Sequence, residues 1–308
     1  MSSAPLPRHD REAGVLRLPR RRSPARAALV ALRPAQWTKN LLLFAGIVFA
    51  AEVGDASRWA AATVAFAAYC AASSAAYLLN DVHDVAADRA HPLKRRRPLA
   101  RGELSSRATV GLAAALVALA GGLAASLGAT SLAWLLGFLV LQGAYTLRLK
   151  HVVLVDVLVI SALFVLRAAA GALAVDVRIS PWLLVCTGLL ALFLALGKRR
   201  GELVLVGEEA TPGRPALQGY SLPLVDQLIG AVAAATIAAY AVYTFTAHSP
   251  ALALTLPLVI FGVFRYLLLL HRPGVGEEPE QVLVTDVPIL ATVALWSATS
   301  AIVLVVFD

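Results

Sequence analysis

Apolar runs of about 20 residues recur along the whole chain and constrain its fold more than any other feature. A helix of that length crosses a hydrocarbon core roughly 30 Å thick. Backbone amides inside lipid must find their partners within the protein, and helices satisfy that requirement. Hydrophobic residues make up 59% of the 308 positions, too large a share for helices that each keep a polar face in water. The sequence therefore predicts an all-α, polytopic transmembrane helical bundle.

Hydropathy divides the chain into one basic tail and one membrane domain. Residues 1–26 are rich in Arg, Pro and Ser and lack the apolar core of a signal peptide, so a disordered basic cytoplasmic tail is expected. Residues 27–308 are expected to form a single transmembrane domain. About nine spans are predicted, at residues 40–53, 57–79, 108–127, 130–147, 152–175, 181–197, 224–247, 251–270 and 287–306.

The distribution of Lys and Arg predicts the orientation. The chain up to Lys39 holds nine of these residues and the loop at 80–107 holds seven, whereas the opposite side holds only Arg58 and Arg178. The richer side is cytoplasmic by the positive-inside rule. The N-terminus is therefore expected inside and, with nine spans, the C-terminus outside. The net charge of +8 is explained by these loops, so no nucleic acid partner is expected.

The segment from Tyr77 to Arg89 carries the most informative polar residues and continues the second span out of the membrane. On a helix that turns 100° per residue, Asn80, Asp84 and Asp88 fall within an arc of about 80°. Asp81 extends the arc to about 100°. Hard oxygen ligands in this arrangement suit Mg²⁺, which often binds one or two carboxylates together with substrate phosphates. The pattern predicts a magnesium site at Asn80, Asp84 and Asp88; a solvated acidic helix end is the alternative.

Cations follow the acidic segment directly. Lys94 and Arg97 are expected to clamp a diphosphate, because a metal held by acids neutralises one side of a phosphate and basic side chains neutralise the other. Arg95 and Arg96 are better explained as a topology signal or a contact with anionic lipids. Lys39, before the first span, fits a substrate contact and a side chain that snorkels to the interface equally well.

Ionisable residues inside a span by default mark a functional site. Asp156 and Arg167 are three helical turns apart on the fifth span and share a face, where either a substrate role or a structural pairing is open. Cys70 and Cys186 lie in apolar runs without metal-ligand spacing and are expected to be buried and unpaired.

The acidic segment, with Asn80, Asp84 and Asp88 at the end of a second span, resembles the first acidic motif of the UbiA superfamily of membrane prenyltransferases. The resemblance extends from Arg33 to the last span and includes the helix count. Four further segments resemble the polyprenyl-phosphate (decaprenyl-phosphate) phosphoribosyltransferase branch. They are Arg33–Asn40, Lys94–Pro98, Tyr145–Lys150 and Gly197–Leu203.

That branch implies a function. Its members use Mg²⁺ to transfer 5-phosphoribose from phosphoribosyl diphosphate to a polyprenyl phosphate, and the product supplies arabinose or ribose donors for the cell envelope. The resemblance implies a bacterial cytoplasmic (inner) membrane location with the active site facing the cytoplasm. Membrane lipids are the surrounding partners, and small residues in the spans permit a homo-oligomer.

The resemblance also implies roles for the remaining residues. Asp84 and Asp81 act at the donor diphosphate, and Asp156 orients a basic residue or a ribose hydroxyl. The substrate contacts are Lys39, Tyr77, Lys94, Arg97, Tyr145, Arg148, Lys150, Arg167, Lys198 and Arg199.

One departure from the superfamily pattern bears on the donor. Superfamily prenyltransferases usually carry a second motif of Asp-x-x-x-Asp type, but Ile160 stands four residues after Asp156. A second metal is therefore less assured, and the surplus cations suit a donor with both a diphosphate and a 5-phosphate. Two alternatives remain: an aromatic prenyltransferase that acts on a quinone precursor, and a lipid-binding transporter or scaffold without metal dependence.

Overall fold

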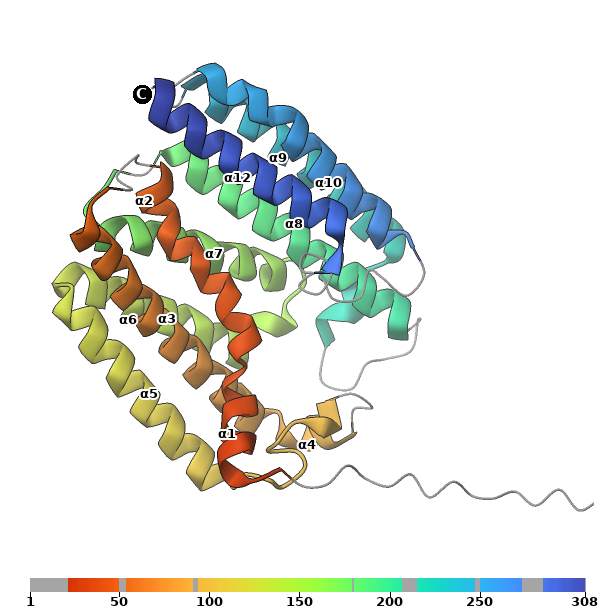
Figure 1. Cartoon of the computed structure of the whole chain (residues 1–308). Helices are drawn as coiled ribbons and strands as arrows, with labels where there is room; N and C mark the ends of the chain where they lie inside the picture. Colours follow the sequence, from red (N-terminus) through yellow and green to blue (C-terminus); the bar gives the residue numbers. More distant parts are fainter. Residues whose placement is uncertain are drawn as a thin grey trace, which may run out of the picture.

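The computed structural model describes residues 22–49, 54–90, 94–178, 180–206, 215–246, 250–272 and 285–307. These residues form a helical bundle without strands, as Figure 1 shows. The α-helices are α1 (Pro24–Leu32), α2 (Ala45–Phe49), α3 (Ala56–His83), α4 (Val85–Ala90), α5 (Ser106–Ser126), α6 (Ala129–Leu147), α7 (Val155–Ala174), α8 (Pro181–Val206), α9 (Leu222–Thr246), α10 (Leu256–Leu270) and α12 (Val287–Phe307). The 3-10 helices are η1 (Pro34–Phe44), η2 (Lys94–Arg96), η3 (Leu149–His151), η4 (Pro215–Gly219) and η5 (Pro250–Thr255).

The all-α, membrane-spanning fold is confirmed, but the count of nine spans is not. Within the described residues, seven helical segments are long and apolar enough to cross a membrane, and they match the predicted spans two to eight. The ninth prediction falls on α12, where a shorter apolar stretch runs from Val287 to Val303. The first prediction, 40–53, falls on the end of η1 and on α2, and residues 50–53 lie outside the described part.

The predicted basic tail falls mostly on residues 1–21, which also lie outside the described part. Helix α1 begins at Pro24, within the last three residues of that prediction, and Ser23 caps it by accepting a hydrogen bond from the Arg26 backbone. Proline in the first turn and serine at the N-cap both favour a helix start at this point.

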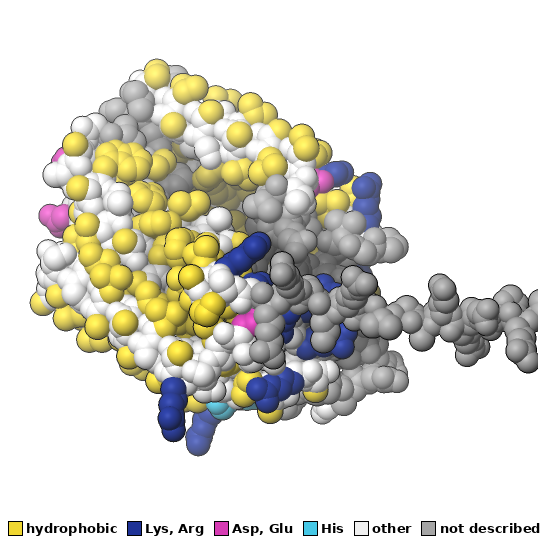
Figure 2. Space-filling view, turned by 60° about the horizontal axis from the view of Figure 1, so that its bottom comes forward, with side chains coloured by type: hydrophobic (Ala, Val, Ile, Leu, Met, Phe, Trp, Pro, Cys, Tyr) yellow, Lys and Arg dark blue, Asp and Glu magenta, His cyan; other side chains and the backbone are white. Residues whose placement is uncertain are grey.

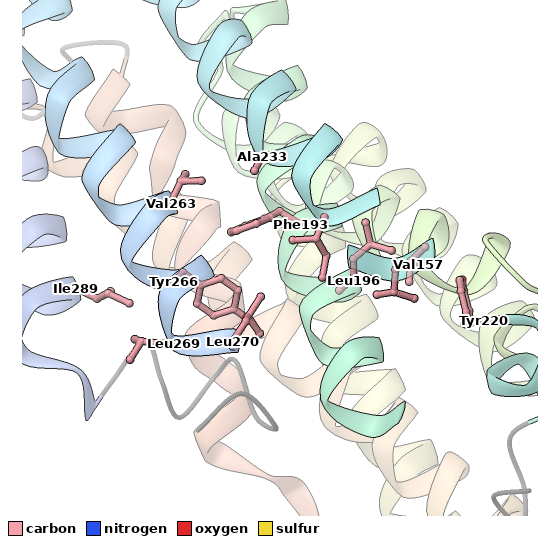
Figure 3. Close-up of a cluster of buried hydrophobic side chains, with 13 residues drawn as sticks. Val157, Phe193, Leu196, Tyr220, Ala233, Val263, Tyr266, Leu269, Leu270 and Ile289 are labelled. Carbon is pink, nitrogen blue, oxygen red and sulfur yellow. The ribbon is translucent and has the colours of Figure 1, made fainter. Parts of the chain in front are cut away.

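The helices form two groups that meet between α7 and α8 (Figure 1). One group consists of α3, α5, α6 and α7, where Tyr69 and Phe138 pack with ring centroids 5.0 Å apart. The other consists of α8, α9, α10 and α12, where Phe193 meets Tyr266 edge to face at 5.2 Å. Figure 3 shows this second cluster, with Val157 of α7 at its boundary. The two groups bring the end of α3 and the start of α7 to the same end of the bundle as the end of α8.

Helix η1 is a 3-10 helix of 11 residues, whereas such helices rarely exceed three or four residues. Arg33, the C-cap of α1, precedes Pro34 and has φ of 55° and ψ of 61°, the left-handed conformation in which many helices end. At the other end of η1 the backbone lies against α7, and a Cβ on Gly171 would stand 2.1 Å from the Leu43 carbonyl oxygen. Glycine therefore allows the two backbones to touch.

We expect Gly171→Ala to destabilise the protein by about 1–3 kcal/mol, the usual cost of overpacking a tight interior. The neighbour is backbone, so it cannot swing aside as a side chain would. Gly122→Ala in α5 is the matched control, because nothing lies within 4 Å of its added Cβ. The free energy of unfolding in detergent measures both; equal effects for the two variants would contradict the close contact.

Candidate active site

Charged side chains gather at the end of the bundle where α3 leads into α4, where η3 leads into α7, and where α8 ends. Figure 2 shows Lys and Arg side chains on this lower face, next to a broad hydrophobic surface. Three groups of ion pairs involve the predicted site residues: one centred on Arg97, one on Lys150 and one on Asp156. The last two groups join segments that are far apart in the sequence.

The acidic segment does not form one uninterrupted helix. Helix α3 ends at His83, Asp84 has φ of −94° and ψ of 8°, and α4 begins at Val85. The break is local, because the Asp84 amide donates to the Asn80 carbonyl at 2.9 Å and the Asp88 amide donates to the Asp84 carbonyl at 2.8 Å. The predicted shared face is therefore largely kept across the break.

The four side chains on that face divide into two neighbouring pairs. Asp81 and Asp88 lie next to each other on the arc, and both are buried. Arg97 donates to Asp81 Oδ1 at 3.1 Å and to Asp88 Oδ2 at 2.6 Å. One guanidinium thus holds both carboxylates, as its several donors in a fixed plane allow. The loop that follows α4 is thereby tied back onto the end of α3.

Arg33 is a second partner of Asp81 and was not among the predicted site residues. Its guanidinium donates to Asp81 Oδ1 and lies 4.7 Å from the centre of the Tyr77 ring. Burial lowers the pKa of Arg33, while the nearby Asp81 carboxylate opposes that shift. Arginine nevertheless stays protonated in proteins, so Asp81 has two cationic partners. The sequence offered one signal for this contact: Arg33 opens the segment that resembles the family.

Asn80 and Asp84 form the other pair and face a different cation. Lys150 Nζ lies 2.9 and 2.8 Å from the two carboxylate oxygens of Asp84 and 3.4 Å from Asn80 Oδ1. Lys150 is buried and reaches this position from η3. The oxygens predicted to bind a metal therefore converge on one positive charge.

This arrangement fits Mg²⁺ with few protein ligands. Among the described residues, no group of three or more His, Cys, Asp or Glu side chains is placed to hold a metal ion. Asn80 and Asp84 nevertheless provide an amide oxygen and a carboxylate that face one cation. Mg²⁺ is commonly bound by one or two carboxylates while substrate phosphates and water complete its shell, so the residues fit this ion. The structure directs Asp88, the third predicted ligand, to Arg97.

Asp156 is the centre of the third group, at the start of α7. Arg199 Nε lies 3.0 Å from Asp156 Oδ2, and both side chains are almost fully buried. The Tyr220 hydroxyl donates to Asp156 Oδ1 at 2.7 Å and accepts from the Leu154 amide at 2.8 Å. Tyr220 thereby supports Leu154, whose φ of 66° is unusual for leucine. The hypothesis that Asp156 orients a basic residue matches its contact with Arg199; Tyr220 had no motif to reveal it.

Arg167 does not contact Asp156, although both lie on α7. It is buried deep in the bundle, where its Nε donates to Asn40 Oδ1 at 2.8 Å and its Nη1 donates to the Leu163 carbonyl at 3.0 Å. The guanidinium also lies 4.7 Å from the centre of the Phe138 ring. Arg167 therefore fixes η1 against α7, and the open alternative of an Asp156–Arg167 pairing is wrong.

The remaining predicted substrate contacts lie at different depths. Lys94 and Arg97 are half-buried, whereas Arg95 and Arg96 are exposed, as a topology signal would be. The Tyr77 hydroxyl donates to Gln36 Oε1 at 3.5 Å, which brings Tyr77 to η1. Lys39 in η1 and Lys198 in α8 are half-buried, Arg148 is exposed at the end of α6, and Tyr145 packs against the hydrophobic cluster of Tyr69 and Phe138.

The apolar helices define an integral membrane protein, and the cations at one end of its bundle are of the kind that bind phosphate groups. A model of the UbiA prenyltransferase family matches residues 41–207. This chain belongs to the UbiA prenyltransferase family, and the resemblance in its acidic segment is confirmed.

Two relatives are similar over most of their length. The decaprenyl-phosphate phosphoribosyltransferase of Corynebacterium glutamicum is 32% identical over 276 residues, which cover 86% of this chain and 83% of that protein. The protein of the same name from Mycobacterium tuberculosis is 31% identical over 289 residues, which cover 87% and 91%.

A solved structure shows the same fold. The UbiA homologue of Archaeoglobus fulgidus bound to GPP and Mg²⁺ superposes with a TM-score of 0.71 over 91% of this chain and all of that one. Its sequence is only 20% identical, so this similarity concerns the fold alone.

Proposed function

We propose that this chain transfers 5-phosphoribose from phosphoribosyl diphosphate to a polyprenyl phosphate, with decaprenyl phosphate as the model acceptor, in a reaction that depends on Mg²⁺. The observation that carries the proposal is its identity of 31–32% to decaprenyl-phosphate phosphoribosyltransferases over 86–87% of the chain. The product would be a polyprenylphosphoryl 5-phosphoribose, from which arabinose or ribose donors for the cell envelope are made.

The charges at the site suit this donor. Phosphoribosyl diphosphate carries a diphosphate at C1 and a phosphate at C5, so it needs cations at two places. Lys94 and Arg97 lie beside the acidic segment, and Lys150 reaches it from η3. Arg148 is the C-cap of α6, and Lys198 lies in the last third of α8, at the same end of the bundle. We assign the first set to the diphosphate and the second to the 5-phosphate.

Asn80 and Asp84 would hold the magnesium ion. Bound there, Mg²⁺ neutralises charge on the diphosphate and so makes it a better leaving group. Asp81 and Asp88 stay with Arg97 and fix the loop that carries Lys94. Lys39 and Tyr77 line the approach from η1 and α3.

The reaction breaks the bond between C1 and the diphosphate oxygen and forms a bond between C1 and an oxygen of the lipid phosphate. We expect oxocarbenium character at C1, with attack from the face opposite the leaving group. The acceptor is already an anion at neutral pH, so no strong general base is needed. Lys94 and Arg97 stabilise the charge that develops on the departing diphosphate, while Asp156 holds Arg199 in place.

We also place the protein in the bacterial cytoplasmic membrane, with the N-terminus and the active site facing the cytoplasm and residues 27–308 as the catalytic domain. The excess of Lys and Arg on the side of the acidic segment supports this orientation. A water-soluble donor is available on that side, and a lipid acceptor can enter from the bilayer.

An aromatic prenyltransferase is the second candidate, because other family members act on prenyl diphosphates. The Archaeoglobus homologue was solved with GPP and Mg²⁺. Ile160 counts against this function, since it stands where a second motif would carry a carboxylate.

Purified protein given Mg²⁺ and either substrate pair distinguishes the two functions. We expect lipid-soluble label from phosphoribosyl diphosphate labelled in its ribose together with decaprenyl phosphate. We expect none from geranyl diphosphate with labelled 4-hydroxybenzoate. Lipid-soluble label from the second pair alone would overturn the proposal.

A further inference from the structure

The contact between Lys150 and the acidic segment has a consequence for metal binding. Lys150 Nζ lies within 2.9 Å of both carboxylate oxygens of Asp84 and 3.4 Å from Asn80 Oδ1. The Lys150 side chain is only 7% exposed, so water does not replace these contacts easily. The Lys150 ammonium group therefore contacts the same oxygens that we assign to Mg²⁺.

A metal ion bound by these oxygens competes with this ammonium group for the same position. Asn80 Oδ1 and both Asp84 carboxylate oxygens face Lys150 Nζ, and two cations held this close to each other repel strongly. Mg²⁺ bound where Lys150 Nζ now lies therefore displaces Lys150. The freed ammonium group, still buried and charged, needs another anionic partner.

We propose that Lys150 occupies the metal position until Mg²⁺ arrives with the donor, and then moves from Asp84 to a phosphate of that donor. The inference rests on the proposed function for the identity of the anion. The Lys150 ammonium group can move because a flexible four-carbon chain connects it to the backbone of η3. Metal and donor binding are thereby coupled, and each strengthens the other by the same factor.

Direct metal binding without any substrate tests the displacement. Mn²⁺ serves as the probe, because the spin-resonance signal of the free ion reports how much is bound to purified full-length protein. We expect Lys150→Met to bind Mn²⁺ about tenfold more tightly than the native protein, since hydrogen bonds to charged groups contribute enough for such a factor. Lys150→Gln, which keeps a neutral donor for these oxygens, should show a smaller gain and guards against a folding defect in the first variant.

Arg107→Met is the matched control. Arg107 is an exposed cation at the same end of the bundle, at the start of α5, and its charge is screened by solvent and salt. We expect a change of less than about twofold in its Mn²⁺ affinity. Equal or weaker Mn²⁺ binding by folded Lys150→Met and Lys150→Gln, compared with the native protein, would overturn the inference.

Addition of phosphoribosyl diphosphate separates this inference from the proposed function. The native protein should bind Mn²⁺ more tightly when the donor is present, and Lys150→Met should gain much less. If neither protein responds to the donor while Lys150→Met still binds Mn²⁺ more tightly alone, the displacement stands and the proposed donor is wrong.

Discussion

Replacing Asp84 with asparagine should lower turnover by at least about 100-fold at saturating substrates, an effect of the size seen when one group that stabilises transition-state charge is removed. Asp84 supplies the only carboxylate in the Asn80–Asp84 pair. An amide in its place keeps the shape but lacks the charge that Mg²⁺ needs. Turnover measured across a range of Mg²⁺ concentrations gives the result.

Asp55→Asn is the matched control for this variant. Asp55 caps the other end of the same helix, α3, and accepts hydrogen bonds from the backbone of Ser57 and Arg58. Asparagine caps helices about as well as aspartate, so activity and stability should stay close to native. Normal turnover of Asp84→Asn in Mg²⁺ would contradict the assignment of the metal site.

Replacing Arg199 with methionine should cost about 3–5 kcal/mol of stability, as expected when one partner of a buried ion pair is removed. Arg199 and Asp156 are 1% and 2% exposed, so Asp156 would keep its charge without a cation beside it. The Tyr220 hydroxyl alone does not offset that charge. The free energy of unfolding in mixed detergent micelles measures the loss.

The next residue provides the control. Arg200 pairs with Asp226 at 2.6 Å and donates to the Leu270 carbonyl at 2.7 Å. The Asp226 side chain is 38% exposed, so Arg200→Met should cost only about 1–2 kcal/mol. Asp156→Asn in the Arg199→Met background should recover part of the loss, because it removes the buried charge of Asp156, while the ion pair between Arg199 and Glu202 stays lost. Equal losses for the two single variants, or no recovery in the double variant, would show that the Asp156–Arg199 pair is not what stabilises this region.

Much of the bundle follows from the sequence because lipid imposes a simple requirement. Runs long enough to span the hydrocarbon core must be helical, and α3 and α5 to α10 lie where hydropathy places them. Helix η1 differs because its form depends on partners distant in the sequence. Arg167 bonds to Asn40 across 127 positions, and Gly171 admits the Leu43 carbonyl. Local propensity contains no information on either contact.

The acidic face of the segment from Asn80 to Asp88 was predictable, but the cation that each of its side chains contacts was not. Helical spacing places Asn80 beside Asp84, and Asp88 beside Asp81, on one arc. The cations that contact these pairs come from the loop before α5, from η3 and from the residue before η1, and only the packing of the bundle decides which cation contacts which pair. Arg167 shows the same limit. Asp156 and Arg167 do lie on one helix, as their spacing predicted, yet the Arg167 side chain donates to Asn40 and not to Asp156.

The position of the label in the donor tests the central claim most directly. Purified protein would receive Mg²⁺, decaprenyl phosphate and phosphoribosyl diphosphate labelled either in the 5-phosphate or in the terminal phosphate of the diphosphate. Transfer of 5-phosphoribose predicts that the 5-phosphate label enters the lipid fraction, while the terminal label remains in water as diphosphate. Terminal label in the lipid, or no 5-phosphate label there, would contradict the proposed reaction.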